Sequence, residues 1–404
     1  MNIFKSRPIL ASSLSLLVLL TCSYHFLIRV GHNLSILVGL TALVVCLSLI
    51  KEAKIFLLHS LEDPRKKILF LCILFFSFAG IIFHFENTIE IGFFLCLFFS
   101  IYLIFKNQDT NLNNFIANLM ICSGVLMSIG VLIGLFESIF LSSKLFYHTY
   151  DGYPYVDQRS IISGFGFNHN FSAYIIVVAQ SFLFLSTSTV MKNLRMYLTV
   201  LFLLALLITG AKMVVLFISL VVCNYFIQNK IRKNVVNIIL VALYLFAAHI
   251  VISFDGDYEL GTRHYNELLF SVVGIDFIQG VYGYIKVAYF FELKDNFFLP
   301  ANLKDITQIV DFDPHNLIFS LIILGGFPLA FSVLIFIFIG IYKNFRIIEE
   351  RYPNYYFCGL ISIITETFLW DSTNSIFFWI IILYAITISK DSYPSNTRAR
   401  ISIN

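Results

Sequence analysis

Charge is scarce in this chain, and that scarcity excludes most soluble folds. Only 13% of its 404 residues are charged, whereas 59% are hydrophobic; soluble domains usually carry about twice that charged fraction. The mean hydropathy is +0.86, and apolar runs of roughly 18 to 25 residues recur along the sequence. The net charge of +3 is too small to indicate nucleic acid as a partner. The sequence therefore predicts an integral membrane protein.

Several chemical signatures are missing as well. All seven cysteines lie in apolar runs, where they act as small hydrophobic residues, so we expect no disulfide framework. The sequence has no metal-ligand spacing, no phosphate-binding glycine loop and no nucleotide fingerprint. We therefore expect neither a metal nor a cofactor. Short alternating segments typical of a transmembrane barrel are also lacking.

Hydropathy predicts an all-α polytopic membrane protein with about twelve transmembrane helices in one membrane domain, residues 1–404. We interpret the first apolar run as an uncleaved helix, because Thr21 is larger than the residue usual before a lipoprotein cysteine. The predicted helices cover about 9–28, 33–50, 68–84, 91–105, 115–141, 161–186, 196–209, 211–228, 235–253, 316–342, 355–370 and 375–389.

The basic residues predict the orientation. Placing the N-terminus in the cytoplasm puts 19 of the 27 lysines and arginines on the cytoplasmic side, as the positive-inside rule requires. Both termini are then cytoplasmic, and residues 254–315 form one large external loop between the ninth and tenth helices. Segments 265–278 and 283–291 predict short helices on the membrane surface. The predicted location is the bacterial inner (cytoplasmic) membrane, with the loop in the periplasm.

The end of the large loop contains the strongest catalytic candidate, His315. Imidazole titrates near neutrality, so it can accept the proton of a sugar hydroxyl. Asp311 and Asp313 could orient this ring, and Asn316 could bind a sugar hydroxyl or cap the following helix. The alternative is that Asp-Pro-His-Asn simply begins that helix.

Basic residues on the external side suggest an anionic ligand, because they do not follow the positive-inside bias. Arg263, early in the large loop, could hold phosphate oxygens through paired hydrogen bonds. Lys212 follows Thr-Gly-Ala at the junction of two predicted helices, and Arg159 precedes a glycine-containing segment. Arg263 and Lys212 could instead contact lipid headgroups.

The segment Ser-Gly-Phe-Gly-Phe-Asn-His-Asn, residues 163–170, joins an irregular backbone to a helix. Its His169 and Asn170 could bind sugar hydroxyls or phosphate, or could have packing and capping roles. The aromatic stretch 147–155 could stack on sugar rings or form an interfacial belt. Acidic residues near the ends of apolar runs, Glu137, Glu366 and Asp371, are compatible with ion pathways or with orienting an external site.

The order of these elements resembles the O-antigen ligase and O-antigen polymerase superfamily over about residues 159–345. Segment 163–170 resembles the glycine-asparagine motif that enters a middle helix. Segment 209–212 resembles the family's Thr-x-Ser-Arg junction. Lys212 stands where arginine is usual and His169 where proline is common, and these departures affect the expected diphosphate contacts.

Two further elements complete the resemblance. Arg263, followed by the glycine-containing segment 274–284, resembles an arginine followed by Gly-x-Gly. Pro-His-Asn at 314–316, with glycines at 325–326, resembles the family's His-Asn element and its downstream glycine.

Membership of this superfamily would imply an inverting, metal-independent glycosyltransferase of the GT-C type. Its donor would be a glycan on undecaprenyl diphosphate, and its acceptor a lipid-linked glycan (polymerase) or lipid A-core (ligase). Arg263 would hold the diphosphate with help from Arg159 or Lys212, and His315 would be the base. Other partners would be membrane lipid and a chain-length regulator or other assembly proteins.

The plain Gly-Phe-Asn-x-Asn motif and the Ile-, Phe- and Asn-rich composition favour the polymerase. A flippase of lipid-linked oligosaccharides is the alternative from another class, and it predicts paired repeats with helices broken at matching positions. A non-catalytic membrane scaffold is the third hypothesis.

Overall fold

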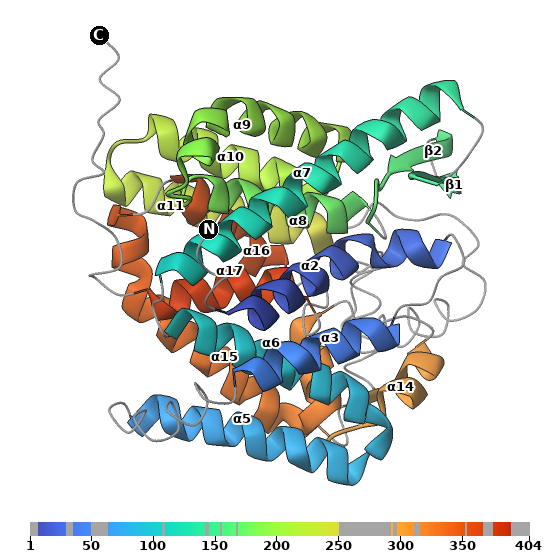
Figure 1. Ribbon diagram of the computed structural model, residues 1–404, viewed down its shortest axis with the longest axis vertical. Helices are drawn as coiled ribbons and strands as arrows, with labels where there is room; N and C mark the ends of the chain where they lie inside the picture. Colours follow the sequence, from blue (N-terminus) through green and yellow to red (C-terminus); the bar gives the residue numbers. More distant parts are fainter. Residues whose placement is uncertain are drawn as a thin grey trace, which may run out of the picture.

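The protein is a bundle of α-helices, seen in the computed structural model of Figure 1. Four helices are long and apolar enough to cross a membrane: Phe85–Lys106, Thr110–Phe140, Thr189–Thr209 and Leu317–Glu349. The chain is therefore a helical membrane protein by the length and composition of its helices. The structure describes residues 7–29, 35–49, 64–106, 110–141, 145–153, 156–166, 169–249, 292–293, 297–310, 316–351, 354–366 and 375–388.

Each of the twelve predicted segments overlaps a helix. These helices are α2 (Pro8–Arg29), α3 (Ser35–Ser48), α5 (Pro64–Phe83), α6 (Thr88–Lys106), α7 (Thr110–Phe140), α8 (His169–Leu183), α9 (Thr189–Thr209), α10 (Lys212–Phe226), α11 (Lys230–His249), α15 (Leu317–Arg351), α16 (Asn354–Glu366) and α17 (Ile376–Thr387). Two shorter elements are the 3-10 turn η2 (Phe85–Asn87) and the amphipathic helix α14 (Leu303–Val310). The surface helices predicted over 265–278 and 283–291 lie outside the described residues.

A β-hairpin departs from the all-α prediction. Strand β1 (Tyr147–Tyr153) pairs antiparallel with β2 (Val156–Ile162), in a register that places Tyr147 opposite Ile162. Tyrosine, threonine, valine and isoleucine favour strands, and the hydropathy of the segment had indicated only an aromatic external stretch. The predicted helix 161–186 consequently begins later, at His169. The hairpin, α14 and the ends of α2, α5 and α7 lie at one end of the bundle, on the right of Figure 1, which we call the hairpin end.

Helix α8 forms the centre of the bundle. Every residue from Ser172 to Leu183 is buried, and α7, α9, α10, α16 and α17 all pack against the helix. Small residues allow these close approaches: a Cβ on Gly124 of α7 would overlap Ala179, and one on Gly359 of α16 would overlap Ser181. Helices in bilayers associate through such small-residue contacts, because lipid tails remove the hydrophobic drive between helices.

Helix α15 is broken at Gly325 and Gly326. Both glycines have non-helical backbone angles, with φ of 73° at Gly326, and Pro328 follows inside the helix. Because proline has no N–H, Pro328 cannot donate the helical hydrogen bond to the carbonyl of Leu324. That carbonyl lies against Gly80 of α5, where a side chain would collide with it. The segment of α15 before the break, residues 317–324, is mostly buried, whereas the remainder continues to Arg351.

Substitution of Gly326 tests whether the break is built into the fold. Its φ and ψ of 73° and 174° belong almost only to glycine, and a Cβ would also lie 2.8 Å from the carbonyl carbon of Phe298. We expect Gly326→Ala to destabilise the protein by about 1–3 kcal/mol, measured by thermal denaturation in detergent micelles.

Gly92→Ala in α6 is the matched control, because nothing lies within 4 Å of the added Cβ. Replacing an unobstructed helical glycine with alanine stabilises by roughly 0.5–1 kcal/mol. Equal melting temperatures for Gly326→Ala and wild type would contradict the expectation.

Candidate functional site

The predicted site residues divide into three groups. Outside the described part of the chain lie Arg263, Asp313 and His315. Described along the backbone only are Arg159 and Lys212. Described with their side chains are His169, Asn170 and Asn316. The candidate site is therefore built from the elements that carry the last two groups.

Glu137 of α7 fastens the hairpin that carries Arg159. Its carboxylate is only 2% exposed and accepts hydrogen bonds from the backbone N–H groups of Leu145 at 2.9 Å and Phe146 at 2.7 Å. The Phe146 carbonyl in turn accepts the N–H of Ser163 at 3.0 Å. A buried carboxylate requires such donors, so these contacts give Glu137 a structural role. The pairing register then sets Arg159 opposite Tyr150.

The glycine-containing segment forms a buried turn between the hairpin and α8. Gly164 has φ of 56°, and a Cβ there would lie 2.7 Å from the backbone nitrogen of Val131. The Ser172 hydroxyl donates to the carbonyl of Ser163. The predicted irregular backbone before the helix is confirmed. His169 and Asn170 follow as the first, half-buried turn of α8.

Lys212 begins α10 directly after a tight junction. Gly210 closes α9 in the left-handed conformation, with φ of 62°, and the Thr209 hydroxyl accepts the N–H of Ala211 at 3.4 Å. Lys212 thus begins a helix at the positive end of its dipole, where the N–H of Val214 donates to the carbonyl of Ala211 at 3.0 Å. A cation in that place is unfavourable by itself, and an anion would stabilise both the charge and the helix start.

Three helices bring these polar groups together. Helices α8, α10 and α16 pack on one another. Helices α8 and α10 begin at the hairpin end, whereas α16 finishes there, so His169, Lys212 and Glu366 share one end of a three-helix junction. Glu366 is only 6% exposed and accepts a hydrogen bond from the hydroxyl of Tyr244 on α11. This junction is the candidate site.

Asn316 caps α15. Its side-chain oxygen accepts the backbone N–H groups of Ile318 at 2.8 Å and Phe319 at 3.2 Å, and the residue is 5% exposed. Of the two roles expected for Asn316, its oxygen therefore performs the capping role. Helix α15 contacts α16 and α17, so it lies beside the three-helix junction.

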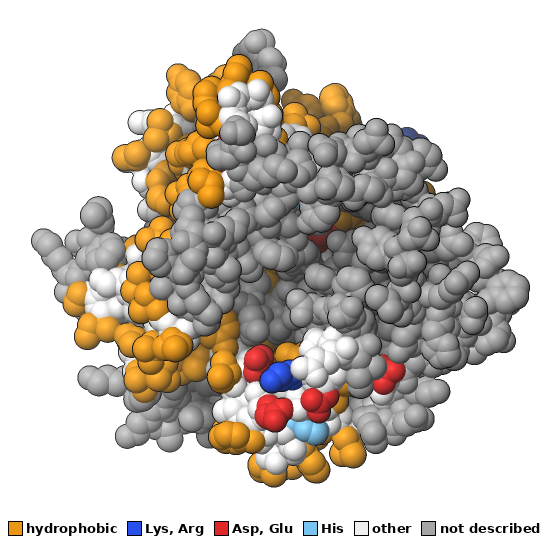
Figure 2. Space-filling view, turned by 90° about the vertical axis from the view of Figure 1, so that its right-hand side faces the viewer, with side chains coloured by type: hydrophobic (Ala, Val, Ile, Leu, Met, Phe, Trp, Pro, Cys, Tyr) orange, Lys and Arg blue, Asp and Glu red, His pale blue; other side chains and the backbone are white. Residues whose placement is uncertain are grey.

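A polar cluster at η2 was not predicted from the sequence. Asn87 binds the backbone of Ala301 and Leu303, and Glu86 accepts a hydrogen bond from Asn302. Figure 2 views the hairpin end and shows acidic, basic and histidine side chains gathered next to hydrophobic ones. The polar run His-Phe-Glu-Asn, between two apolar segments, was the only sign of this cluster in the sequence. It did not indicate that residues 301–303, more than 200 residues away, are its partner.

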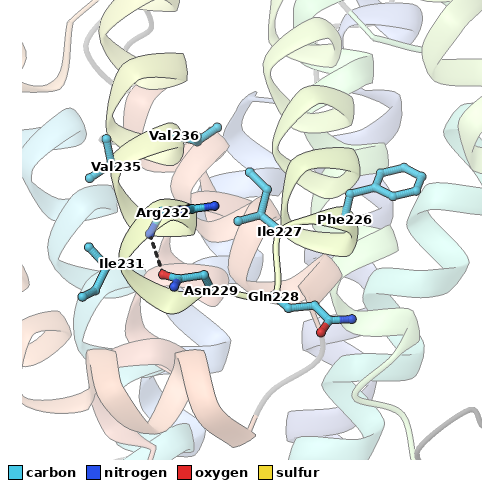
Figure 3. A pocket seen from close by; sticks show the side chains of 8 residues that line it. All are labelled: Phe226, Ile227, Gln228, Asn229, Ile231, Arg232, Val235 and Val236. Atoms are coloured by element: carbon cyan, nitrogen blue, oxygen red, sulfur yellow. Dashed lines mark hydrogen bonds between the residues drawn. The ribbon is translucent and has the colours of Figure 1, made fainter.

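The opposite end of the bundle has a different character. Glu349 of α15 pairs with Lys230 of α11 at 3.0 Å and with Lys233 at 3.7 Å. Between α10 and α11 lies a hollow of about 530 Å³, lined by Arg232 and mostly apolar neighbours (Figure 3). Its described lining has no acidic, histidine or cysteine side chain, so it supplies no group for acid-base chemistry.

Comparisons with known proteins give no assignment. No protein-family model, no curated protein and no solved structure matches this chain. Within the described residues, no group of three or more His, Cys, Asp or Glu side chains could hold a metal ion.

Two variants of Asn316 separate capping from ligand binding. Aspartate caps as well as asparagine, whereas alanine loses the cap at a cost of about 1 kcal/mol. We therefore expect Asn316→Ala to lower the stability of the purified protein by that amount and Asn316→Asp to preserve it, as measured by thermal denaturation. Equal destabilisation by both substitutions would contradict a capping role.

Proposed function

We propose that this protein is a membrane glycosyltransferase that moves a glycan from undecaprenyl diphosphate to a glycan acceptor at the outer face of the bacterial inner membrane. The proposed topology has twelve membrane-spanning helices, two cytoplasmic termini and a periplasmic hairpin end. The product is O-antigen or another surface polysaccharide.

The three-helix junction carries the proposal. The start of α10 combines the positive end of a helix dipole with a lysine in the first turn. A diphosphate is the kind of ligand that such a helix start accommodates, because the helix dipole and the lysine charge both stabilise its negative charge. The half-buried His169 and Asn170 of α8 add hydrogen-bonding groups at the same end. This combination favours a phosphate-linked, polar substrate.

The proposed reaction is a single displacement with inversion at the anomeric carbon. The acceptor hydroxyl attacks that carbon, the bond from the carbon to the diphosphate oxygen breaks, and undecaprenyl diphosphate leaves with the bonding electrons. His315, oriented by Asp313, accepts the hydroxyl proton. Arg263 holds the diphosphate and stabilises its growing charge, with Lys212 and Arg159 assisting.

The acceptor distinguishes two forms of this activity. A polymerase would use the next lipid-linked repeat unit, and a ligase would use lipid A-core. The plain Gly-Phe-Asn-x-Asn motif favours the polymerase. A chain-length regulator would then be a further partner.

One observation favours a second candidate, a transporter of lipid-linked oligosaccharides. Such proteins bind their substrates at discontinuous helices, and α15 is interrupted at Gly325 and Gly326. Transporters built from repeats have a matching break in the other half of the molecule. Among the described helices, only α15 has interior residues with non-helical angles, so we place the transporter second.

The proposal is tested by the lipopolysaccharide ladder of a deletion strain. We expect complementation with wild type to restore the ladder, and His315→Ala and Arg263→Ala to fail at matched protein levels. Lys212→Met should reduce ladder formation by about ten- to a hundredfold, the effect of losing one hydrogen-bonded charge. Lys212→Arg should retain formation, because it keeps the charge. Lys304→Ala is the control, since Lys304 is an exposed lysine at the same end.

The pattern of the defect identifies the acceptor. Core carrying one repeat unit indicates a polymerase, whereas bare core with polymer accumulating on the lipid carrier indicates a ligase. A normal ladder with both His315→Ala and Arg263→Ala would refute the catalytic assignment and favour the transporter or the scaffold.

A further inference from the structure

The break in α15 is filled by a distant part of the chain, residues 297–303, which we call the strap. In an uninterrupted helix the N–H of Phe327 would donate to the carbonyl of Ile323, four residues earlier. Here Phe327 donates instead to Phe297 at 2.9 Å, and Ile323 accepts the N–H of Ala301 at 2.8 Å. The strap thus provides new partners for both members of one missing helical hydrogen bond.

The strap fits because the two glycines leave room for it. A Cβ on Gly326 would collide with the carbonyl of Phe298. The ring of Phe297 stacks on that of Phe327, with centroids 5.1 Å apart. The break in α15 is therefore stable only with the strap in place, because unpaired backbone groups are unfavourable in an apolar environment.

Asn87 is the buried side chain that holds the strap. Its amide nitrogen donates to the carbonyl of Ala301 at 2.7 Å, and its oxygen accepts the N–H of Leu303 at 3.1 Å. Both ends of the amide are used, and the residue is 1% exposed. The backbone of Ala301 therefore links Asn87, through its carbonyl, to Ile323 of α15, through its N–H.

The other contacts of the strap lie nearer to solvent. The Nε2 of His84 is hydrogen-bonded to the carbonyl of Pro300 at 3.1 Å, and His84 is partly exposed. Glu86, which accepts a hydrogen bond from Asn302, is exposed. Water can replace a partner at the surface, whereas a buried peptide that loses its partner has no substitute. Asn87 should therefore dominate the attachment.

We propose that Asn87 is a positioning residue that acts through Ala301 and Leu303. It keeps the strap in the break and so fixes the segment of α15 before the break, residues 317–324, at whose start Asn316 forms the cap. The role in glycosyl transfer rests on the proposed function; the role in holding the break does not.

The first experiment measures amide hydrogen exchange of the full-length protein in nanodiscs. In Asn87→Leu we expect the amides of Ala301, Leu303 and Phe327 to exchange at least about tenfold faster than in wild type, because their acceptors or the strap itself are released. Thr88→Val is the control: it removes a hydroxyl that bonds only locally, to Phe85, and exchange at the three amides should not change.

A second variant covers the case in which Asn87→Leu fails to fold. Asn87→Asp keeps an oxygen for the Leu303 N–H but loses the donor to Ala301. We expect faster exchange at Ala301 and Phe327, with Leu303 remaining within about threefold of wild type. Wild-type exchange at Ala301 and Phe327 in a folded variant would overturn the proposal.

The second experiment measures transfer rates in the same nanodiscs against the concentration of glycolipid donor extracted from membranes of the host strain. Displacing a reacting group by about 1 Å can cost a hundredfold. We expect kcat of the Asn87 variants to fall about ten- to a hundredfold while KM for the donor stays within about twofold.

The outcomes separate the two proposals. Unchanged kcat, or a fall in kcat accompanied by a higher donor KM, would overturn the positioning role. If wild type transfers no glycan, the proposed function fails and the catalytic part of this inference fails with it. The exchange rates then still decide whether Asn87 holds the break.

Discussion

The structure depends on one constraint: backbone groups that leave a regular helix within an apolar bundle must find another hydrogen-bonding partner. The chain meets it in two places by bringing in a distant segment or a buried side chain. At Gly325 and Gly326 the strap replaces both halves of a helical hydrogen bond. At the base of the hairpin, the carboxylate of Glu137 receives two N–H groups. Irregular backbone is thereby fixed at the hairpin end.

Because the irregular backbone at the hairpin end is held by hydrogen bonds, a bundle of apolar helices can present polar residues there. Helix packing alone aligns the starts of α8 and α10 with the end of α16, but it does not orient the chain beyond those ends. The turn anchored at Phe146 leads the chain into His169, and the junction at Gly210 leads it into Lys212. Rigid entry points place first-turn residues reproducibly, as the proposed glycosyl transfer would require.

Hydropathy located the helices because a membrane-spanning segment must be apolar along its whole length, a local property that a single sequence displays. The break in α15 was not predicted, although its two glycines were noted, since glycines alone do not reveal that a strap fills the gap. Asn87 was missed for the same reason: its partners, Ala301 and Leu303, are distant in sequence. From the sequence, Asn316 could either cap the following helix or bind a sugar hydroxyl. Its hydrogen bonds to Ile318 and Phe319 show that it caps the helix.

The strap also bears on the choice between transferase and transporter. A transporter alternates between two states by rocking or gating one part of the molecule against another. If that motion passed through the break in α15, the backbone groups there would have to exchange partners. In α15 the freed groups of Ile323 and Phe327 are paired to the strap, and Ala301 of the strap is paired again to the buried Asn87. Opening this arrangement would leave several buried groups unpaired at once, and each costs about 1–3 kcal/mol. A helix break whose backbone groups are paired in this way favours the proposed transferase, which needs a rigid site, over a transporter whose helices move at the break.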